Sequence, residues 1–142
     1  RHKVERHILC TQFFRIFLEL QHLFVAKILH ARAEEQALVK GFRDSFDFAT
    51  ARAVADLRLL CELCLPYVKV GGAFLAMKSV ECDEELDHAA PCIKLLGGRV
   101  EKCRDYTVPG TDIVHRVVII RKVAPTLKGY PRKWAKMQKE PL

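Results

Sequence analysis

The amino-acid sequence predicts an α/β fold: a mostly parallel sheet with helices on both faces, which ends in an antiparallel pair of strands. Helical and strand patterns alternate along most of the chain, as they do where helices connect parallel strands. Only residues 109–114 separate the last two predicted strands, which is too short for a crossover. The 142 residues, 50% hydrophobic and 29% charged, suit a single globular domain.

The first half of the chain contains two predicted helices and two predicted strands. Apolar residues lie on more than one side of 13–23, which indicates a buried helix, and residues 24–29 form an apolar run typical of a short strand. After a turn, residues 46–51 alternate as a strand does. Asp56 is a suitable N-cap for a helix over 57–67.

The second half continues the alternation. After a glycine pair, residues 73–77 are a predicted buried strand, and 82–96 a helix that Pro91 should kink or split. Two strands follow, at 99–108 and 115–122. Prolines and a glycine then predict an irregular tail. A parallel α/β sheet that ends in an antiparallel pair is the usual arrangement of class I methyltransferases, and ligands bind at the carboxyl ends of such strands.

The positive charge is concentrated at the end of the chain. Residues 1–115 carry as many acidic as basic residues, so the whole net charge of +7 lies in 116–142. We therefore divide the chain into a domain at 1–123 and a basic C-terminal tail at 124–142. Tyr130 and Trp134 are interleaved with this charge, which favours a nucleic acid as the partner over a merely solubilising tail.

Cys61 and Cys64 form the closest pair among six cysteines. Their C-x-x-C spacing is compatible with zinc or redox chemistry, but no second pair or histidine motif follows at zinc spacing. Both residues lie in an apolar segment with helical periodicity, so buried free thiols are the preferred interpretation and a reducing compartment is expected. We expect no metal site, and no apolar run is long enough to span a membrane.

Ten short sequence motifs occur in an order that closely resembles the one found in the GidB/RsmG family. They are HARAEE at 30–35, FDFATARAVA at 46–55, CLP at 64–66, GG at 71–72, AMK at 76–78, LGG at 96–98, YTVPG at 106–110, RK at 121–122, YPRK at 130–133 and PL at 141–142. Members of this family are S-adenosyl-L-methionine-dependent methyltransferases that modify N7 of a guanine in small-subunit (16S) ribosomal RNA. The resemblance implies the same cofactor, reaction and RNA partner here, with a Rossmann-like fold.

The resemblance also implies candidate cofactor-binding residues. Glu5 corresponds to the acidic residue that contacts the cofactor ribose, Ala33 and Glu34 to the pair that cradles the adenine, and Arg52 to an arginine of the cofactor pocket. The alternatives are an acid at a helix start for Glu34 and a surface ion pair for Arg52. The family's glycine-rich cofactor loop would lie upstream of residue 4, so 1–123 is a partial methyltransferase domain. The chain is either a fragment, which Arg1 as first residue favours, or a degenerate relative.

The expected chemistry needs few catalytic side chains. Guanine N7 carries a free lone pair and the sulfonium is an excellent leaving group, so in-line placement of the two partners could supply most of the rate. No catalytic residue is therefore assigned. For RNA binding, Arg132, Lys133 and Lys136 are expected to contact phosphates, and Tyr130 and Trp134 to stack on bases.

Two alternatives remain open for the function. One is a non-enzymatic RNA-binding remnant of the family, and the other is a methyltransferase with a changed substrate. The expected location is the cytoplasm, or an organelle if a targeting segment precedes the first residue.

Overall fold

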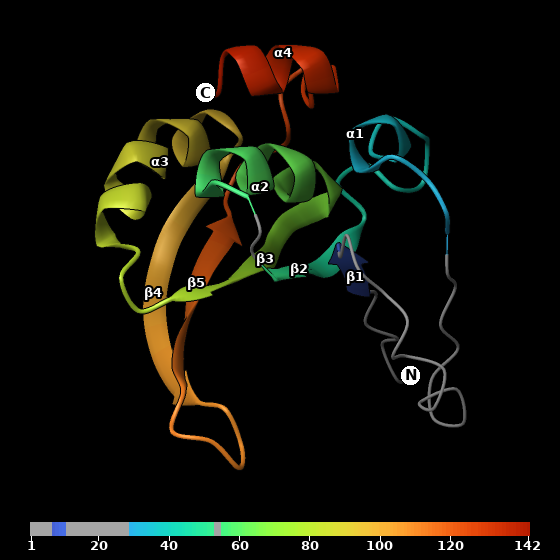
Figure 1. The fold of residues 1–142 in the computed structure, drawn as a ribbon. Coiled ribbons are helices and arrows are strands. Elements are labelled where there is room, and N and C mark those ends of the chain that lie inside the picture. Colours follow the sequence, from blue (N-terminus) through green and yellow to red (C-terminus); the bar gives the residue numbers. More distant parts are fainter. Residues whose placement is uncertain (1–6, 11–28, 53–54) are drawn as a thin grey trace, which may run out of the picture.

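The computed structural model describes residues 7–10, 29–52 and 55–142, which contain one five-stranded sheet (Figure 1). The strands are β1 (His7–Cys10), β2 (Phe46–Arg52), β3 (Val68–Ser79), β4 (Gly98–Thr107) and β5 (Val114–Lys122). Their order across the sheet is β1-β2-β3-β5-β4. β1, β2 and β3 run parallel, whereas β5 is antiparallel to both of its neighbours. The predicted final antiparallel pair is confirmed.

The predicted strands and the observed ones agree best after residue 45. The strand expected at 46–51 is present as β2, and the one expected at 73–77 is the second half of the longer β3. The helix expected at 13–23 and residues 24–28 of the next strand lie outside the described residues, and Leu29 is not part of a strand. Sequence patterns did not predict β1.

The helices of the described residues all cover one face of the sheet (Figure 1). They are α1 (Ala33–Gln36), α2 (Leu57–Cys64), α3 (Asp83–Leu95) and α4 (Trp134–Lys139), and a short 3₁₀ turn, η1 (Leu65–Tyr67), continues α2. From β2 to β3 and β4 the chain moves in the same direction across the sheet, and right-handed crossovers then place these two connections on the same face. Within the described residues, helices on both faces are therefore not seen. None of these helices is both long and apolar enough to cross a membrane.

The core lies between the sheet and the layer formed by α2 and α3. Phe74, Val118 and Ile120 project from the sheet and are completely buried, as is Leu57 at the start of α2. Small side chains on β2, Ala49 and Ala51, let the helices approach closely. This apolar contact fixes the positions of the strand ends, because the β-strands are held against one rigid helical layer.

The N-cap predicted at Asp56 is confirmed. Its Oδ1 atom accepts hydrogen bonds from the backbone N of Arg58 at 2.9 Å and from Arg58 Nε at 2.9 Å. Burial raises the pKa of Asp56, but these contacts with Arg58 outweigh it and hold the pKa below its ordinary value. The helix ends at Cys64, and the predicted remainder to Tyr67 is the 3₁₀ turn that contains Pro66.

α3 continues through Pro91 as one helix, so the predicted split does not occur. Pro91 is exposed, while its neighbours Cys92 and Ile93 pack into the core, and this packing compensates for the missing backbone donor. Gly97 then ends the helix with a positive φ of 79°. At Gly98 a Cβ atom would lie 2.9 Å from Ile120 Cγ2, so only glycine allows β4 to begin this close to the core.

The interpretation of the C-x-x-C pair as buried helical thiols is confirmed. Cys61 and Cys64 are buried inside α2 and form no disulfide, and burial raises the pKa of Cys61 well above its ordinary value. Burial likewise raises the pKa of Cys92 to about 12, whereas Cys103 is exposed. In the described part of the chain, no group of three His, Cys, Asp or Glu side chains is arranged to hold a metal ion.

Candidate functional site

The carboxyl ends of β1, β2 and β3 lie along one edge of the sheet, which we call the carboxyl edge. Arg52 is the last residue of β2, is exposed, and lies beside Met77 of β3. Ligands of parallel α/β sheets bind at this edge. Arg52 therefore lies on the side of the sheet where a cofactor would bind. A surface ion pair, the alternative for Arg52, is not found among the described residues.

A buried lysine holds the chain that follows Arg52. Lys78 Nζ donates to the carbonyl of Ala55 at 2.8 Å and forms an ion pair with Glu85 of α3. Glu85 Oε1 also accepts from the backbone N of Leu57 at 2.6 Å. One ion pair therefore ties the end of β3, the start of α2 and the start of α3 together at the carboxyl edge. Lys78 belongs to the AMK motif at 76–78, one of the motifs that resemble the family, but no role was predicted for it from the sequence.

Ala33 and Glu34 lie away from Arg52. The Tyr67 hydroxyl donates to the carbonyl of Ala33 at 2.6 Å, and Tyr67 immediately precedes β3 at the opposite, amino edge. The seven residues of β2 separate the two edges by about 20 Å. Glu34 is buried and its carboxylate lies 3.1 Å from Arg32 Nε. The structure therefore does not bring the expected adenine-binding pair together with Arg52, and Glu5 lies outside the described residues.

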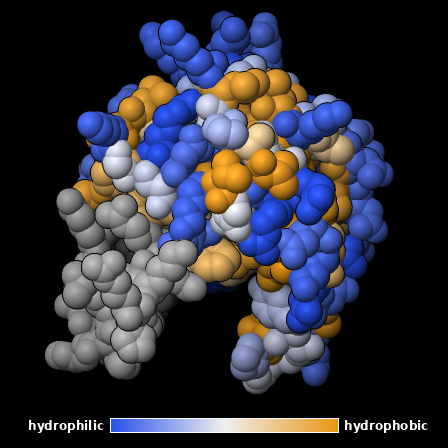
Figure 2. All heavy atoms as spheres, turned by 180° about the vertical axis from the view of Figure 1, so that it is seen from behind, coloured by the Kyte–Doolittle hydropathy of each residue, from blue (hydrophilic) through white to orange (hydrophobic). Residues whose placement is uncertain are grey.

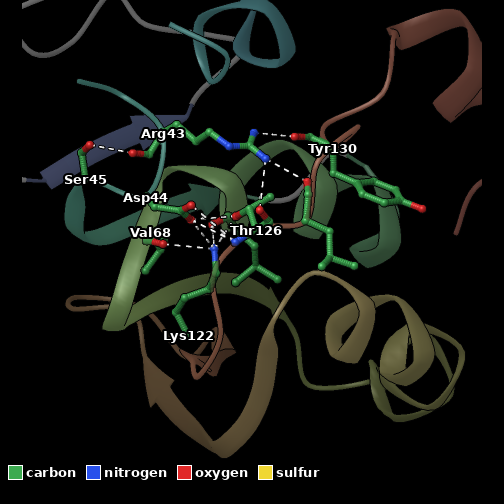
Figure 3. Close-up of polar contacts among 9 residues, drawn as sticks. Arg43, Asp44, Ser45, Val68, Lys122, Thr126 and Tyr130 are labelled. Carbon is green, nitrogen blue, oxygen red and sulfur yellow. Dashed lines mark hydrogen bonds and ion pairs between the residues drawn. The ribbon is translucent and has the colours of Figure 1, made fainter. Parts of the chain in front are cut away.

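The basic tail begins at the amino edge, where it is anchored by Lys122 (Figure 3). The Lys122 side chain is completely buried, and its Nζ donates to Asp44 Oδ1 at 2.9 Å and Thr126 Oγ1 at 2.6 Å. It also donates to two backbone carbonyls around η1, those of Leu65 at 2.7 Å and Val68 at 3.1 Å. Burial lowers the pKa of Lys122, while Asp44 opposes that shift.

Arg43 holds the next part of the tail. Its guanidinium donates to the carbonyl of Tyr130 at 2.5 Å, and also to the carbonyls of Thr126 at 3.2 Å and Leu127 at 2.8 Å (Figure 3). One side chain, 83 to 87 residues earlier in the sequence, thus binds three carbonyls of the tail. Residues 124–130 are therefore packed on the domain, although they contain no helix or strand.

Arg132 is engaged inside the protein. Its Nε and NH2 donate to the Glu62 carboxylate at 2.9 and 2.8 Å, and its backbone N donates to the same group at 2.8 Å. Hydrogen bonding to Glu62 raises the pKa of Arg132, and the Glu62 side chain is only 1% exposed. This geometry corrects the expectation of a free guanidinium at Arg132, because the group is already neutralised by a buried acid.

The remaining residues predicted to contact RNA lie in α4 or shortly before it in the sequence. The predicted irregular tail is wrong here, because the helix buries Met137 completely against the domain. Lys133 and Lys136 are exposed, and Tyr130 and Trp134 are half-buried. In Figure 2, hydrophilic side chains project from the top of the molecule, over α4. Of the five predicted RNA contacts, Lys133 and Lys136 thus present free charges.

The fold, the strand order and the exposed arginine at the carboxyl edge define a Rossmann-like α/β protein. Residues 5–112 match the family model of GidB, the rRNA small subunit methyltransferase G. The chain belongs to this family, which confirms the resemblance and the fold class predicted from the sequence.

Relatives support the same assignment. Two of the curated relatives, both called ribosomal RNA small subunit methyltransferase G, come from Acetivibrio thermocellus and Clostridium novyi. The first is 40% identical over 132 residues, covering 93% of this chain and 54% of the relative. The second is 46% identical over 114 residues, covering 80% of this chain and 47% of the relative. This chain thus spans about half the length of the relatives. Among solved structures, a SAM-dependent O-methyltransferase from Thermotoga maritima matches with a TM-score of 0.41 and 14% identity, covering 65% of this chain and 38% of that one.

Proposed function

We propose that this chain forms part of an enzyme that transfers a methyl group from S-adenosyl-L-methionine to N7 of a guanine in small-subunit ribosomal RNA. The match of residues 5–112 to the family model is the observation that carries this proposal. The ribosomal substrate places the activity in the cytoplasm. The RNA partner and the position of the methyl group follow the family and not a contact in the structure.

The described residues supply one part of a cofactor site. Arg52 offers a guanidinium at the carboxyl edge, and such a group suits the carboxylate of a methionine moiety. Among the described residues, no glycine follows the carboxyl end of β2 or β3, so no glycine-rich cofactor loop is found at these two positions. We therefore derive no step of methyl transfer from these residues. Glu5, Ala33 and Glu34 stay proposed cofactor contacts on the family resemblance alone.

The tail is proposed as one of the RNA-binding surfaces. Lys133 and Lys136 are exposed and suited to phosphates, and the half-buried rings of Tyr130 and Trp134 leave part of their area for stacking. Arg132 supports these residues by docking the tail on Glu62.

Methyl transfer can be measured directly. The chain is incubated with tritiated S-adenosyl-L-methionine and 16S ribosomal RNA, both alone and joined to the part of the Acetivibrio thermocellus relative that it does not match. We expect N7-methylguanine in digests of the RNA treated with the joined protein. RNA binding without methylation by the joined protein would instead support the non-enzymatic remnant. A methyl group at another position would support a changed substrate.

Arg52 should matter more for methylation than a nearby arginine of similar chemistry. In the joined protein, Arg52→Ala is expected to lower methylation about tenfold or more, because a hydrogen bond to a charged group contributes about 1.5–3 kcal/mol. Arg58→Ala is the matched control, since Arg58 is bonded to Asp56 on the surface of α2. Initial rates at saturating RNA, together with melting temperatures, separate activity from stability. Equal losses of activity in the two variants would remove Arg52 from the site.

A further inference from the structure

The final hairpin extends beyond the rest of the sheet. We call residues 99–119 the arm: β4, the connecting loop and most of β5, which project away from the helical layer in Figure 1. β3 ends at Ser79, which pairs with His115, so the last part of the arm has no third strand beside it. The arm therefore flanks the carboxyl edge, whereas α4 lies at the other end of the molecule (Figure 1).

The two faces of the arm differ in charge. Residues paired directly across antiparallel strands share a face. On the helix side, Asp105 pairs with Arg116, and Arg116 Nε lies 2.7 Å from Asp105 and its NH1 2.9 Å from Asp83 of α3. These charges neutralise one another. The helix side of the arm is therefore occupied by its own ion pairs.

The opposite face of the arm, which we call the helix-free face because no helix of the described residues covers it, carries cations that have no acidic partner among these residues. Lys102 pairs with Ile119, Arg104 with Val117 and Arg99 with Arg121, all on the face opposite the core. No ion pair is found for Arg99, Lys102 or Arg104 within the described residues, and all three are exposed. The one acid in this row, Glu101, is bound to Arg121 at 2.7 Å. Same-face neighbours on a strand lie about 6.6 Å apart, so the cations form a short row.

An aromatic pair continues this row toward the tip. The Tyr106 ring lies 6.0 Å from the His115 ring, with the planes tilted by 36°, and Tyr106 is 37% exposed. The charged row is also close to Arg52. Arg52, Met77, Val117 and Arg104 are paired in register on four neighbouring strands. The Cα atoms of Arg52 and Arg104 are therefore about 14 Å apart, and both residues lie on the same face of the sheet.

We propose that the helix-free face of the arm binds an unpaired segment of ribosomal RNA beside the carboxyl edge. Arg99, Lys102 and Arg104 contact successive phosphates, and Tyr106, supported by His115, stacks on a base. This assignment rests on the proposed function, which supplies the RNA. It puts an RNA contact next to Arg52, whereas the lysines of the tail lie beyond the opposite edge. Figure 2 shows hydrophilic side chains along the arm at the lower right.

The salt dependence of RNA binding tests the arm. The chain is titrated with a transcript of Clostridium novyi 16S ribosomal RNA at several salt concentrations. In the triple variant Arg99→Gln, Lys102→Gln, Arg104→Gln, the slope of log K against log salt should fall by about 2, since each lost phosphate contact removes about 0.7. The control Lys40→Gln, Lys94→Gln removes two charges from exposed positions outside the arm and the tail. Its slope should stay within about 0.7 of the parent slope.

Tyr106→Ala provides an independent measurement. Loss of one stacked base should weaken binding by about 5- to 150-fold and leave the salt slope unchanged. Parent affinity in Tyr106→Ala, or a slope loss in the arm variant no larger than in the control variant, would overturn the proposal. If the arm variant of the joined protein also binds and methylates RNA as the parent does, the arm role is lost and the proposed function stands. If the unaltered joined protein neither binds nor methylates this RNA, both fail.

Discussion

Glu62→Ala is expected to lower the free energy of unfolding by about 3–5 kcal/mol, because it leaves the Arg132 guanidinium without its buried partner. The lost carboxylate accepts hydrogen bonds from three nitrogen atoms of Arg132, one of them the backbone N. Water cannot replace it, since the Glu62 side chain is almost fully buried. The same change should release the tail from the domain, because no other acid holds Arg132 among the described residues.

Urea unfolding followed by circular dichroism measures this loss, and limited trypsin digestion measures release of the tail at Lys133 and Lys136. Glu62→Gln keeps an acceptor for Arg132 and should lose less stability than Glu62→Ala. Glu101→Ala is the control for an ion pair on the surface: its partner Arg121 is solvated, so little stability should be lost. If Glu62→Ala unfolds at the same urea concentration as the parent, Arg132 does not depend on this pair.

Lys122→Met should cost at least about 3 kcal/mol of stability. The lysine donates to a carboxylate, a hydroxyl and two carbonyls, and a thioether can donate to none of them. Asp44 would then be left as a half-buried acid with only Thr126 as a side-chain partner. The tail leaves the sheet at this point, so the loss should also loosen residues 124–130.

A double-mutant cycle with Asp44→Asn isolates the ion pair. The double variant should be more stable than the sum of the single losses predicts, because no unpaired charge remains. Lys128→Met, at an exposed position of the tail, should change stability by no more than about 0.5 kcal/mol. A loss in Lys122→Met no larger than in Lys128→Met would contradict the anchoring role.

The pH dependence gives a second check on Lys122. Burial lowers its pKa, so the folded lysine releases its proton at a lower pH than the unfolded one, with its ordinary value of 10.5. Unfolding then takes up a proton in this range, and the stability of the parent rises with pH toward 10.5. Lys122→Met lacks this contribution, so the difference between parent and variant should widen as the pH is raised from 7 to 10.

Local patterns predicted the type and order of the main elements between residues 46 and 122, although not all of their bounds. The N-cap at Asp56 and the end of α3 at Gly97 each depend on contacts within a few residues, and such signals can be recognised in a single sequence. The antiparallel pairing of β4 and β5 followed from the length of their connection. Arg52, which the family resemblance assigns to the cofactor pocket, is the last residue of β2 in the structure.

The tertiary structure decided which charges are free. In the sequence Arg132 is one of eight basic residues after 115, and nothing nearby distinguishes it from Lys133. Its partner Glu62 is 70 residues away, and only the folding of the tail onto α2 brings the two together. The same holds for Lys122 and Asp44, which are 78 residues apart. The sequence by itself determined the net charge and, through its alternating patterns, the α/β fold class. The accessible charge depends on burial and pairing, which only the packed chain defines.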